Sequence, residues 1–280
     1  MSIDLIISLL SYLLAAGYII GITFYGITFF SKSSGKTDIY GSKSRLIIKL
    51  VILLHILYFI IRSVHYKHAP ITGVFELLTL LAFSLTITYV YIEIRTKVYQ
   101  TGFFILLIAG IFQIISTLYI QELKEINPVL RSWLLGVHVS TALIGYSAIM
   151  ISGIYGFLYL MMYSSIKKNN PSNFYKKLPS LQLLERLAAN AIKFGFVFLT
   201  TTILIGAIWL PSAIDDFSYS DPKLIVTFMI WVVYGLGYTS IKIYRTQSKT
   251  TMTLALLGFV FAFVSILILN FLFTSFHRFY

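Results

Sequence analysis

The residues of this sequence best suited to ligand chemistry are its five histidines, His55, His65, His68, His138 and His277. Imidazole binds metal ions and gains or loses a proton near neutral pH. The sequence contains no cysteine, which excludes disulfides, thiolate metal sites, thioether attachment of a prosthetic group and thiol redox chemistry. What the histidines can do therefore depends on the elements that position them.

The composition is typical of an integral membrane protein. Apolar residues make up 58% of the 280 residues, charged residues make up 11%, and the mean hydropathy is +0.86, which excludes a soluble domain of this length. The net charge of +12 does not indicate nucleic-acid binding, because the basic residues fall in short breaks between apolar runs. The first apolar run follows Asp4 without a preceding Lys or Arg or a small-residue cleavage site. It is therefore predicted to be a span and not a signal peptide.

Eight apolar segments are long enough to cross a bilayer, for which a helix needs ~20 mostly apolar residues. The predicted fold class is thus all-α, a polytopic protein in which residues 1–280 form a single integral membrane domain. The predicted spans cover residues 5–30, 46–64, 71–94, 100–120, 131–163, 189–210, 223–244 and 251–276. Within the break at 164–188, the stretch "SLQLLERL" is predicted to be a short amphipathic helix on the cytoplasmic surface.

The distribution of Lys and Arg predicts the orientation, because these residues concentrate in cytoplasmic loops. With the N-terminus outside, sixteen of them fall in the inner breaks and six in the outer ones. Both termini are therefore predicted to lie outside, and the protein is predicted to be a multi-pass protein of the bacterial inner (cytoplasmic) membrane.

Four of the five histidines then lie near the outer face. At 100° per residue His138, near the outer end of the fifth span, shares a helix face with the small residues Thr141, Ala142, Gly145, Ser152 and Gly156. Small residues mark the faces on which membrane helices pack, so His138 is predicted to face the bundle. His277, at the outer end of the eighth span, shares its face with Asn270 and Thr274.

Two inward imidazoles at one depth suit the axial positions of haem iron, whereas zinc would need a third and fourth ligand. The alternative is that each histidine is an interface anchor or a satisfied hydrogen-bonding group. His55 lies in the middle of the second span. It is either a second ligand site or, the favoured interpretation, a hydrogen-bonded structural histidine.

The outer segment "GAIWLPSAIDDFSYSDPK" links the sixth and seventh spans. Its end, "DPK", predicts a helix start with Asp221 as N-cap and Pro222 at the first helical position. Trp209, Phe217 and Tyr219 either form an interfacial aromatic belt or provide a flat platform for a porphyrin.

From about residue 62 to the C-terminus the chain resembles the haem-handling cytochrome c assembly superfamily. "RSVHYKHAPITGVFELLTLLAF" is similar to a family block with a basic residue, a histidine before proline and a glutamate at the start of a span. "RSWLLGVHVSTALIGYSA" resembles the block with the first outer haem-ligating histidine, and "LNFLFTSFHRFY" the block with the second. The resemblance implies that His138 and His277 are axial ligands of a non-covalent haem b. The loop from Trp209 to Asp221 would then cover the porphyrin.

Further residues are candidates through the same resemblance. His68 and Arg62 belong to the first matching block, and Arg62, Lys67, Arg131 or Lys223 could pair with the haem propionates.

The sequence also departs from the family pattern. The outer loop keeps one tryptophan, Trp209, with Ile214, Ser218 and Ser220 where others are expected, and Thr239 replaces an intramembrane histidine that synthases use as an inner haem ligand. By its length, its number of spans, the degenerate loop and the ending "FH-x-F", the chain most resembles the HemX-type branch. Proteins of that branch are encoded with early tetrapyrrole-synthesis enzymes and are linked to control of glutamyl-tRNA reductase.

Three functions remain open from the sequence. The first is haem delivery at the outer face in cytochrome c assembly, with haem and an assembly protein as partners. The second is a regulator or scaffold of haem biosynthesis that holds a tetrapyrrole-synthesis enzyme through the basic 164–188 segment. The third is a transporter of another substrate. No independent catalytic activity is expected.

Overall fold

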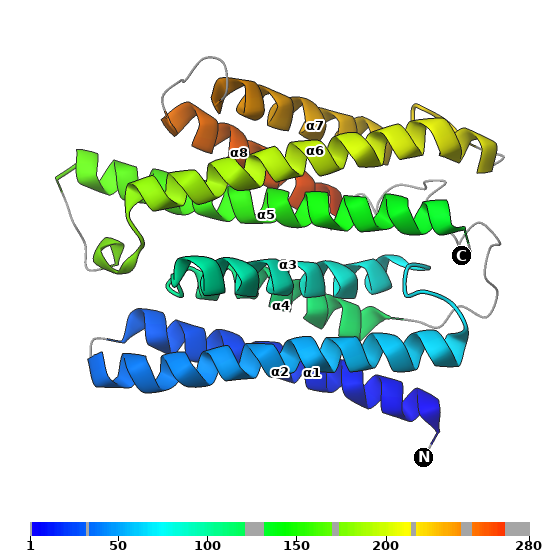
Figure 1. Ribbon diagram of the computed structural model, residues 1–280, viewed down its shortest axis with the longest axis horizontal. Coiled ribbons are helices and arrows are strands. Elements are labelled where there is room, and N and C mark those ends of the chain that lie inside the picture. The colour runs from blue at the N-terminus through cyan, green and yellow to red at the C-terminus, as the bar shows by residue number, and fades with distance from the viewer. Residues whose placement is uncertain are drawn as a thin grey trace. The chain divides into compact units, whose positions relative to one another are not determined.

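The computed structural model describes residues 2–31, 34–120, 132–169, 174–213, 217–241 and 248–266, and every regular element in these ranges is helical (Figure 1). By its internal contacts the chain divides into two compact units, residues 1–126 and 127–280. Each unit is a set of packed helices, as expected where lipid offers the backbone no hydrogen-bond partners.

Unit 1 contains four helices: α1 (Ile3–Phe30), α2 (Ser34–Tyr66), α3 (Val74–Thr96) and α4 (Gly102–Tyr119). α1 packs against α2 and α4, and α3 packs mainly against α4. The fully buried side chains at the centre of the unit include Leu14, Leu85, Ile105, Ala109 and Phe112. Leucines and isoleucines on the other face of α1, such as Leu9 and Leu13, are about half exposed, as expected for a helix that faces lipid.

Unit 2 contains α5 (Trp133–Lys167), the 3₁₀ turn η2 (Tyr175–Lys177), α6 (Leu181–Ala213), α7 (Pro222–Thr239) and α8 (Ser248–Val264). α5 packs against both α6 and α8, and α7 packs against α6 and α8. The predicted small-residue face of α5 makes these contacts. Gly145 lies against Leu199 of α6, Ser152 is hydrogen-bonded to the Tyr234 hydroxyl of α7, and Gly156 lies against the Met252 carbonyl of α8.

Seven helices are long and apolar enough to cross a membrane, and Lys249–Val264 forms a shorter apolar helix in the described part of the chain. The predicted all-helical polytopic fold is confirmed. The predicted eighth span, 251–276, is described only to residue 266, so its outer half, with His277, lies outside the described residues.

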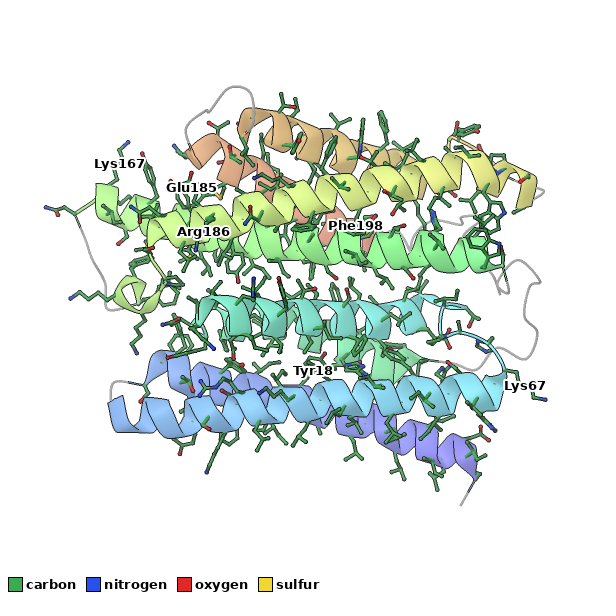
Figure 2. The ribbon with its side chains drawn as sticks, in the orientation of Figure 1. Tyr18, Lys67, Lys167, Glu185, Arg186 and Phe198 are labelled. Atoms are coloured by element: carbon green, nitrogen blue, oxygen red, sulfur yellow. The ribbon has the colours of Figure 1, made fainter. Side chains whose placement is uncertain are left out.

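The prediction of a separate surface helix over "SLQLLERL" is wrong. Residues 181–187 are the first two turns of α6, which runs without interruption for 33 residues. The segment has Pro179 before it and neither Gly nor Pro inside it, so nothing breaks the helical hydrogen bonds between it and the span. A 33-residue helix is about 50 Å long against a hydrocarbon core of about 30 Å. Its first turns, with Glu185 and Arg186 (Figure 2), therefore extend beyond the apolar span.

Candidate functional site

His138 is held between α5 and α6. It lies in the second turn of α5, and its Nδ1 is 3.1 Å from the backbone carbonyl oxygen of Thr202 in α6. A carbonyl can only accept, so Nδ1 carries the proton and Nε2 is the unprotonated nitrogen. Nε2 has no hydrogen-bond partner among the described residues. A backbone carbonyl fixes the tautomer and the ring in this way at metal-binding histidines. The same hydrogen bond also satisfies a structural histidine, so it agrees with both interpretations that the sequence left open.

The helix surface beside His138 is built for a close approach. A Cβ on Gly206 would lie 3.1 Å from Cε1 and 3.5 Å from Nδ1 of the imidazole, so a side chain at this position would press on the ring. The Thr202 hydroxyl donates to the Thr141 hydroxyl at 3.0 Å, and the Thr141 hydroxyl in turn donates to the His138 carbonyl at 2.9 Å. These bonds fix the α5–α6 register at the histidine.

Trp209 belongs to the same face of α6. Residues 202, 206 and 209 follow one another at helical spacing, so they form one stripe along the helix. Because α6 continues to Ala213, Trp209 is a helical residue and not part of a loop, and its side chain is half-buried. Its place is one turn beyond Gly206, towards the end of α6 that leads into the 214–221 connection.

Asp221 caps α7, as its sequence predicted. Its Oδ1 accepts from the Lys223 backbone N–H at 2.8 Å, and Pro222 occupies the first helical position. In the preceding connection the rings of Phe217 and Tyr219 meet edge to face, and the Tyr219 hydroxyl donates to the Ala207 carbonyl of α6. Asp221 is buried, and its visible role is to hold the start of α7 and not to expose a charge.

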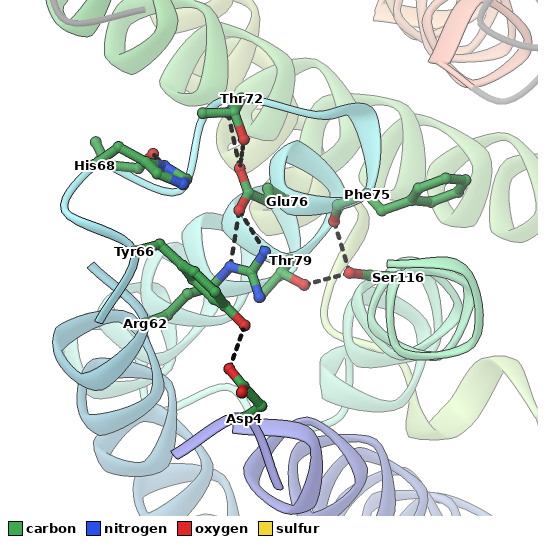
Figure 3. A network of polar contacts seen from close by, with 10 residues as sticks. Asp4, Arg62, Tyr66, His68, Thr72, Phe75, Glu76, Thr79 and Ser116 are labelled. Atoms are coloured by element: carbon green, nitrogen blue, oxygen red, sulfur yellow. Dashed lines mark hydrogen bonds and ion pairs between the residues drawn. The ribbon is translucent and has the colours of Figure 1, made fainter. Parts of the chain in front are cut away.

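Arg62 and His68 belong to unit 1, at the junction of α2 and α3 (Figure 3). Arg62 Nη2 lies 2.7 Å from Glu76 Oε1, and both side chains are at most 5% exposed. Glu76 Oε2 also accepts from the backbone N–H and the hydroxyl of Thr72. The Arg62 guanidinium additionally covers the ring of Tyr66 at 4.8 Å, so this cation is neutralised within its own unit.

His68 lies in the connection that follows α2. Its Nδ1 donates to the Ala69 carbonyl at 2.8 Å, and its ring stacks near that of Tyr66. Of the candidate residues, the structure thus groups His138 with the α6 stripe of Trp209 in unit 2, and Arg62 with His68 at one end of unit 1. His277 lies outside the described residues, so the predicted His138–His277 pair stays a prediction.

The structure also shows the hydrogen bonds of His55 and Thr239, two positions that the sequence analysis discussed. His55 is fully buried, and its Nε2 is 3.1 Å from the Tyr18 hydroxyl. This is the hydrogen bond expected of the favoured structural interpretation. Thr239 donates its hydroxyl to the Gly235 carbonyl one turn earlier at 2.8 Å, so this side chain is engaged by its own helix. Within the described residues no group of three or more His, Asp or Glu could hold a metal ion.

The sequence interpretation missed a group of buried acids and tyrosines in unit 1. Glu93, in the last turn of α3, accepts hydrogen bonds at Oε2 from the hydroxyls of Tyr25 (2.7 Å) and Tyr89. The signal was present as a seven-residue spacing. Polar residues recur at 11, 18 and 25, at 55 and 62, and at 79, 86 and 93, a spacing that keeps side chains on one helix face.

Comparison with known proteins supplies a family context for this geometry. The family model described as "Cytochrome C assembly protein" matches residues 71–277. The chain is 28% identical over 260 residues to the cytochrome c biogenesis protein CcsA of Guillardia theta, covering 86% of this chain and 84% of that protein. It is 26% identical over 241 residues to CcsA of Trieres chinensis, covering 75% and 77%. It is also 26% identical over 186 residues to the protein HemX of Brevibacillus brevis, covering 64% and 66%.

Proposed function

The chain belongs to the cytochrome C assembly protein family, as its sequence predicted, and from this premise we propose that it binds haem b non-covalently with His138 as an axial ligand and acts in cytochrome c biogenesis. The proposal places the haem at the predicted outer face of the membrane. Haem would be held without a thioether bond, because the sequence contains no cysteine to attach it. The bound iron would supply two axial positions for nitrogen ligands.

The observation that carries the proposal is the hydrogen bond from His138 Nδ1 to the Thr202 carbonyl. It leaves Nε2 as the basic nitrogen, and a histidine in this tautomer fits an axial position of haem iron. Gly206 supports the same assignment, because it lets the imidazole lie against α6. The residues present therefore fit the group that the family implies.

The second axial ligand in this proposal is His277, and Trp209 supplies an apolar surface on the α6 stripe beside His138. The propionates would pair with basic residues of the outer segments. Arg62 is the least suited of the candidates to this role, because it is bound to Glu76 in a buried ion pair. Thr239 gives no further ligand, since its hydroxyl is committed to the Gly235 carbonyl and a hydroxyl is a poor ligand for haem iron. The proposal therefore has a single site, which binds one haem per chain.

The experiment is a haem titration of the detergent-purified full-length protein, followed by absorption and electron paramagnetic resonance spectroscopy. We expect one equivalent of low-spin, six-coordinate haem. His138→Ala and His277→Ala should each open an axial position and convert the spectrum to high-spin, whereas His65→Ala, which alters a surface histidine bound to Asp4, should leave it low-spin. Unchanged spectra in both ligand variants would remove the proposal, and two low-spin haems per chain would refute the single site.

A second candidate function has its own support. The similarity to HemX, together with a threonine in place of the inner ligand, favours a regulator of haem biosynthesis that acts on glutamyl-tRNA reductase. Its docking surface would be the basic 164–188 segment, whose Lys167, Lys168 and Lys176 are exposed.

Deletion of the gene in its own organism separates the two functions. Loss of mature cytochromes c with unchanged reductase abundance supports assembly. Altered reductase abundance with normal cytochromes c supports regulation. Reversal of the positive charge in the 164–188 segment should affect only the second outcome.

A further inference from the structure

Unit 1 contains a line of buried polar side chains that the haem proposal does not use. It comprises residues from all four helices, and we name it the polar column: Ser11, Tyr18, Tyr25, His55, Arg62, Glu76, Thr79, Thr86, Tyr89, Glu93, Gln113, Ser116 and Thr117. Each of these side chains belongs to a buried residue. Ionisable groups at membrane depth are costly and often mark substrate, ion or proton pathways, whereas hydroxyl and amide groups also join helices by hydrogen bonds.

The column extends over most of the membrane thickness. On α3 it begins at Glu76 in the first turn and ends at Glu93 in the last. At about 1.5 Å per residue these two carboxylates are about 25 Å apart along the helix, close to the ~30 Å of the hydrocarbon core. Thr79 and Thr86 lie between them on the same face, because seven residues fall only about 20° short of two helical turns.

The predicted outer end is the Arg62–Glu76 cluster shown in Figure 3. Below it, the hydroxyls of Thr79 and Ser116 are 2.6 Å apart, and the Ser116 hydroxyl also donates to the Phe75 carbonyl. On the α1–α4 side the Ser11 hydroxyl donates to the Thr117 hydroxyl at 3.0 Å, and Gln113 Nε2 donates to the same oxygen. Hydroxyl groups can both donate and accept, so the Thr79–Ser116 and Ser11–Thr117 contacts can pass a proton, whereas the Phe75 carbonyl and the Gln113 amide only hold these hydroxyls in place.

The centre of the column is His55. Its Nε2 meets the Tyr18 hydroxyl at 3.1 Å, and that hydroxyl lies 2.6 Å from the Thr86 hydroxyl and 3.1 Å from the Ala82 carbonyl. Aromatic rings of Tyr18, Phe59 and Phe83 surround the imidazole on three helices. Tyr18 is labelled in Figure 2, where it lies among the helices of unit 1.

The predicted inner end is Glu93, which accepts from Tyr25 and Tyr89. It lies four residues before Lys97 and close to the basic inner connections. The column therefore has a carboxylate at each end and an imidazole in the middle, and each is hydrogen-bonded to a hydroxyl group of a column residue or, at Glu76, of Thr72.

The hydrogen bonds among the described residues leave these groups separate from one another, so conduction along the column requires water between them. His55 Nδ1 and Gln113 Oε1 are fully buried and have no hydrogen-bond partner among the described residues. Buried polar atoms are nearly always satisfied, and where protein groups do not satisfy them internal water does. Waters at these two atoms would extend the column on either side of the Tyr18–His55–Thr86 centre.

We propose that unit 1 conducts protons across the membrane through the polar column, with His55 as the central carrier. The imidazole accepts a proton at one ring nitrogen and releases one from the other, and the Tyr18 hydroxyl exchanges protons between His55 and Thr86. Glu93 and Glu76 exchange protons with the two aqueous sides. Each step breaks one O–H or N–H bond and forms another, so no oxidation state changes and no oxidant or reductant is needed. The proton electrochemical gradient supplies the driving force.

The test is a proton-flux assay on the full-length protein without haem, reconstituted in liposomes. A potassium gradient with valinomycin sets a negative interior, and a pH-sensitive dye in the lumen reports proton uptake. We expect uptake faster than in protein-free liposomes, and loss of this excess in His55→Phe and in Tyr18→Phe. Tyr18→Phe removes a single hydroxyl group and keeps the ring, so it tests the path even if His55→Phe does not fold.

Matched controls come from the lipid-facing sides of the same helices. Tyr12 of α1 is 59% exposed and Tyr91 of α3 is 61% exposed, so Tyr12→Phe and Tyr91→Phe should conduct like the natural protein. Uptake no faster than in protein-free liposomes would overturn the proposal. Uptake unchanged in Tyr18→Phe would overturn it as well. In both cases the column would serve only to hold the helices together, and the haem titration, which needs no flux, would be unaffected.

Discussion

The two units of this protein differ in the side chains that they bury between their helices. Unit 1 buries charged and hydroxyl-bearing groups, among them Arg62, Glu76 and Glu93. Unit 2 joins α5 to its neighbours largely through small residues, and a Cβ on Gly153 would lie only 2.1 Å from Cβ of Phe259. Both are recognised ways to associate helices in a membrane, by polar bonds or by close backbone approach. The comparison teaches that a buried ion pair, Arg62–Glu76, joins two helices of unit 1, while the closest approach at a described glycine, Gly153, lies in unit 2.

The largest effect should come from breaking the buried pair of unit 1. Arg62→Met leaves Glu76 charged and without its cation, which costs about 3–5 kcal/mol. The double variant Arg62→Met/Glu76→Leu should recover much of this loss, because no isolated charge remains. The measurement is unfolding by denaturant in detergent micelles. If the double variant were as unstable as Arg62→Met alone, the unpaired charge of Glu76 would not be the cause of the lost stability.

A smaller effect is expected from adding a methyl group to the packing face of unit 2. Gly153→Ala should destabilise by about 1–3 kcal/mol through overpacking, because the Cβ of Phe259 cannot rotate away. Gly136→Ala on the same helix is the matched control, since a Cβ there meets no atom of the described residues within 4 Å. It should be neutral or stabilise by up to about 1 kcal/mol, the ordinary helical preference for alanine. Equal effects at both sites would contradict the shape argument.

Removing the N-cap of α7 should have a modest effect. Asp221→Ala loses the hydrogen bond to the Lys223 N–H and should cost about 1 kcal/mol. Asp221→Asn retains an acceptor oxygen and should lose little. Thermal unfolding of the three proteins, followed by circular dichroism, checks the ranking. If the Asp221→Asn and Asp221→Ala variants have the same unfolding temperature, the stabilising role of Asp221 is not helix capping.

The smallest effect is expected from Gly206→Ala, which tests the contact between His138 and α6 that the haem proposal uses. Gly206→Ala places a Cβ 3.1 Å from Cε1 of His138, tight enough to displace the ring by a few tenths of an ångström without unfolding unit 2. We expect haem affinity to fall by less than about fivefold, or under about 1 kcal/mol, with a shifted low-spin spectrum. Gly136→Ala again serves as control. An unchanged spectrum and affinity would mean that the imidazole does not need its present contact with α6.

Local features of the sequence were enough to predict much of this structure. The spans follow from apolar length alone, because a bilayer forces each long apolar run into a helix. The Asp221 cap and the small-residue face of α5 from His138 to Gly156 depend only on neighbours within a few turns. The prediction of a separate helix over "SLQLLERL" was wrong because it overlooked a local feature. No helix-breaking residue lies between residue 181 and the span that follows, so the two form one helix.

The sequence by itself thus determined the helices, their apolar faces and the family of the chain. Only the tertiary structure decided which distant groups meet: Arg62 with Glu76, Tyr18 with His55, Tyr25 with Glu93, and His138 with the Thr202 carbonyl. The physical reason is that helical periodicity tells which face of a helix is polar, but not which helix lies opposite or at what height. In a membrane the choice of partner is made by helix packing, and a buried polar side chain is satisfied only where that packing supplies its partner.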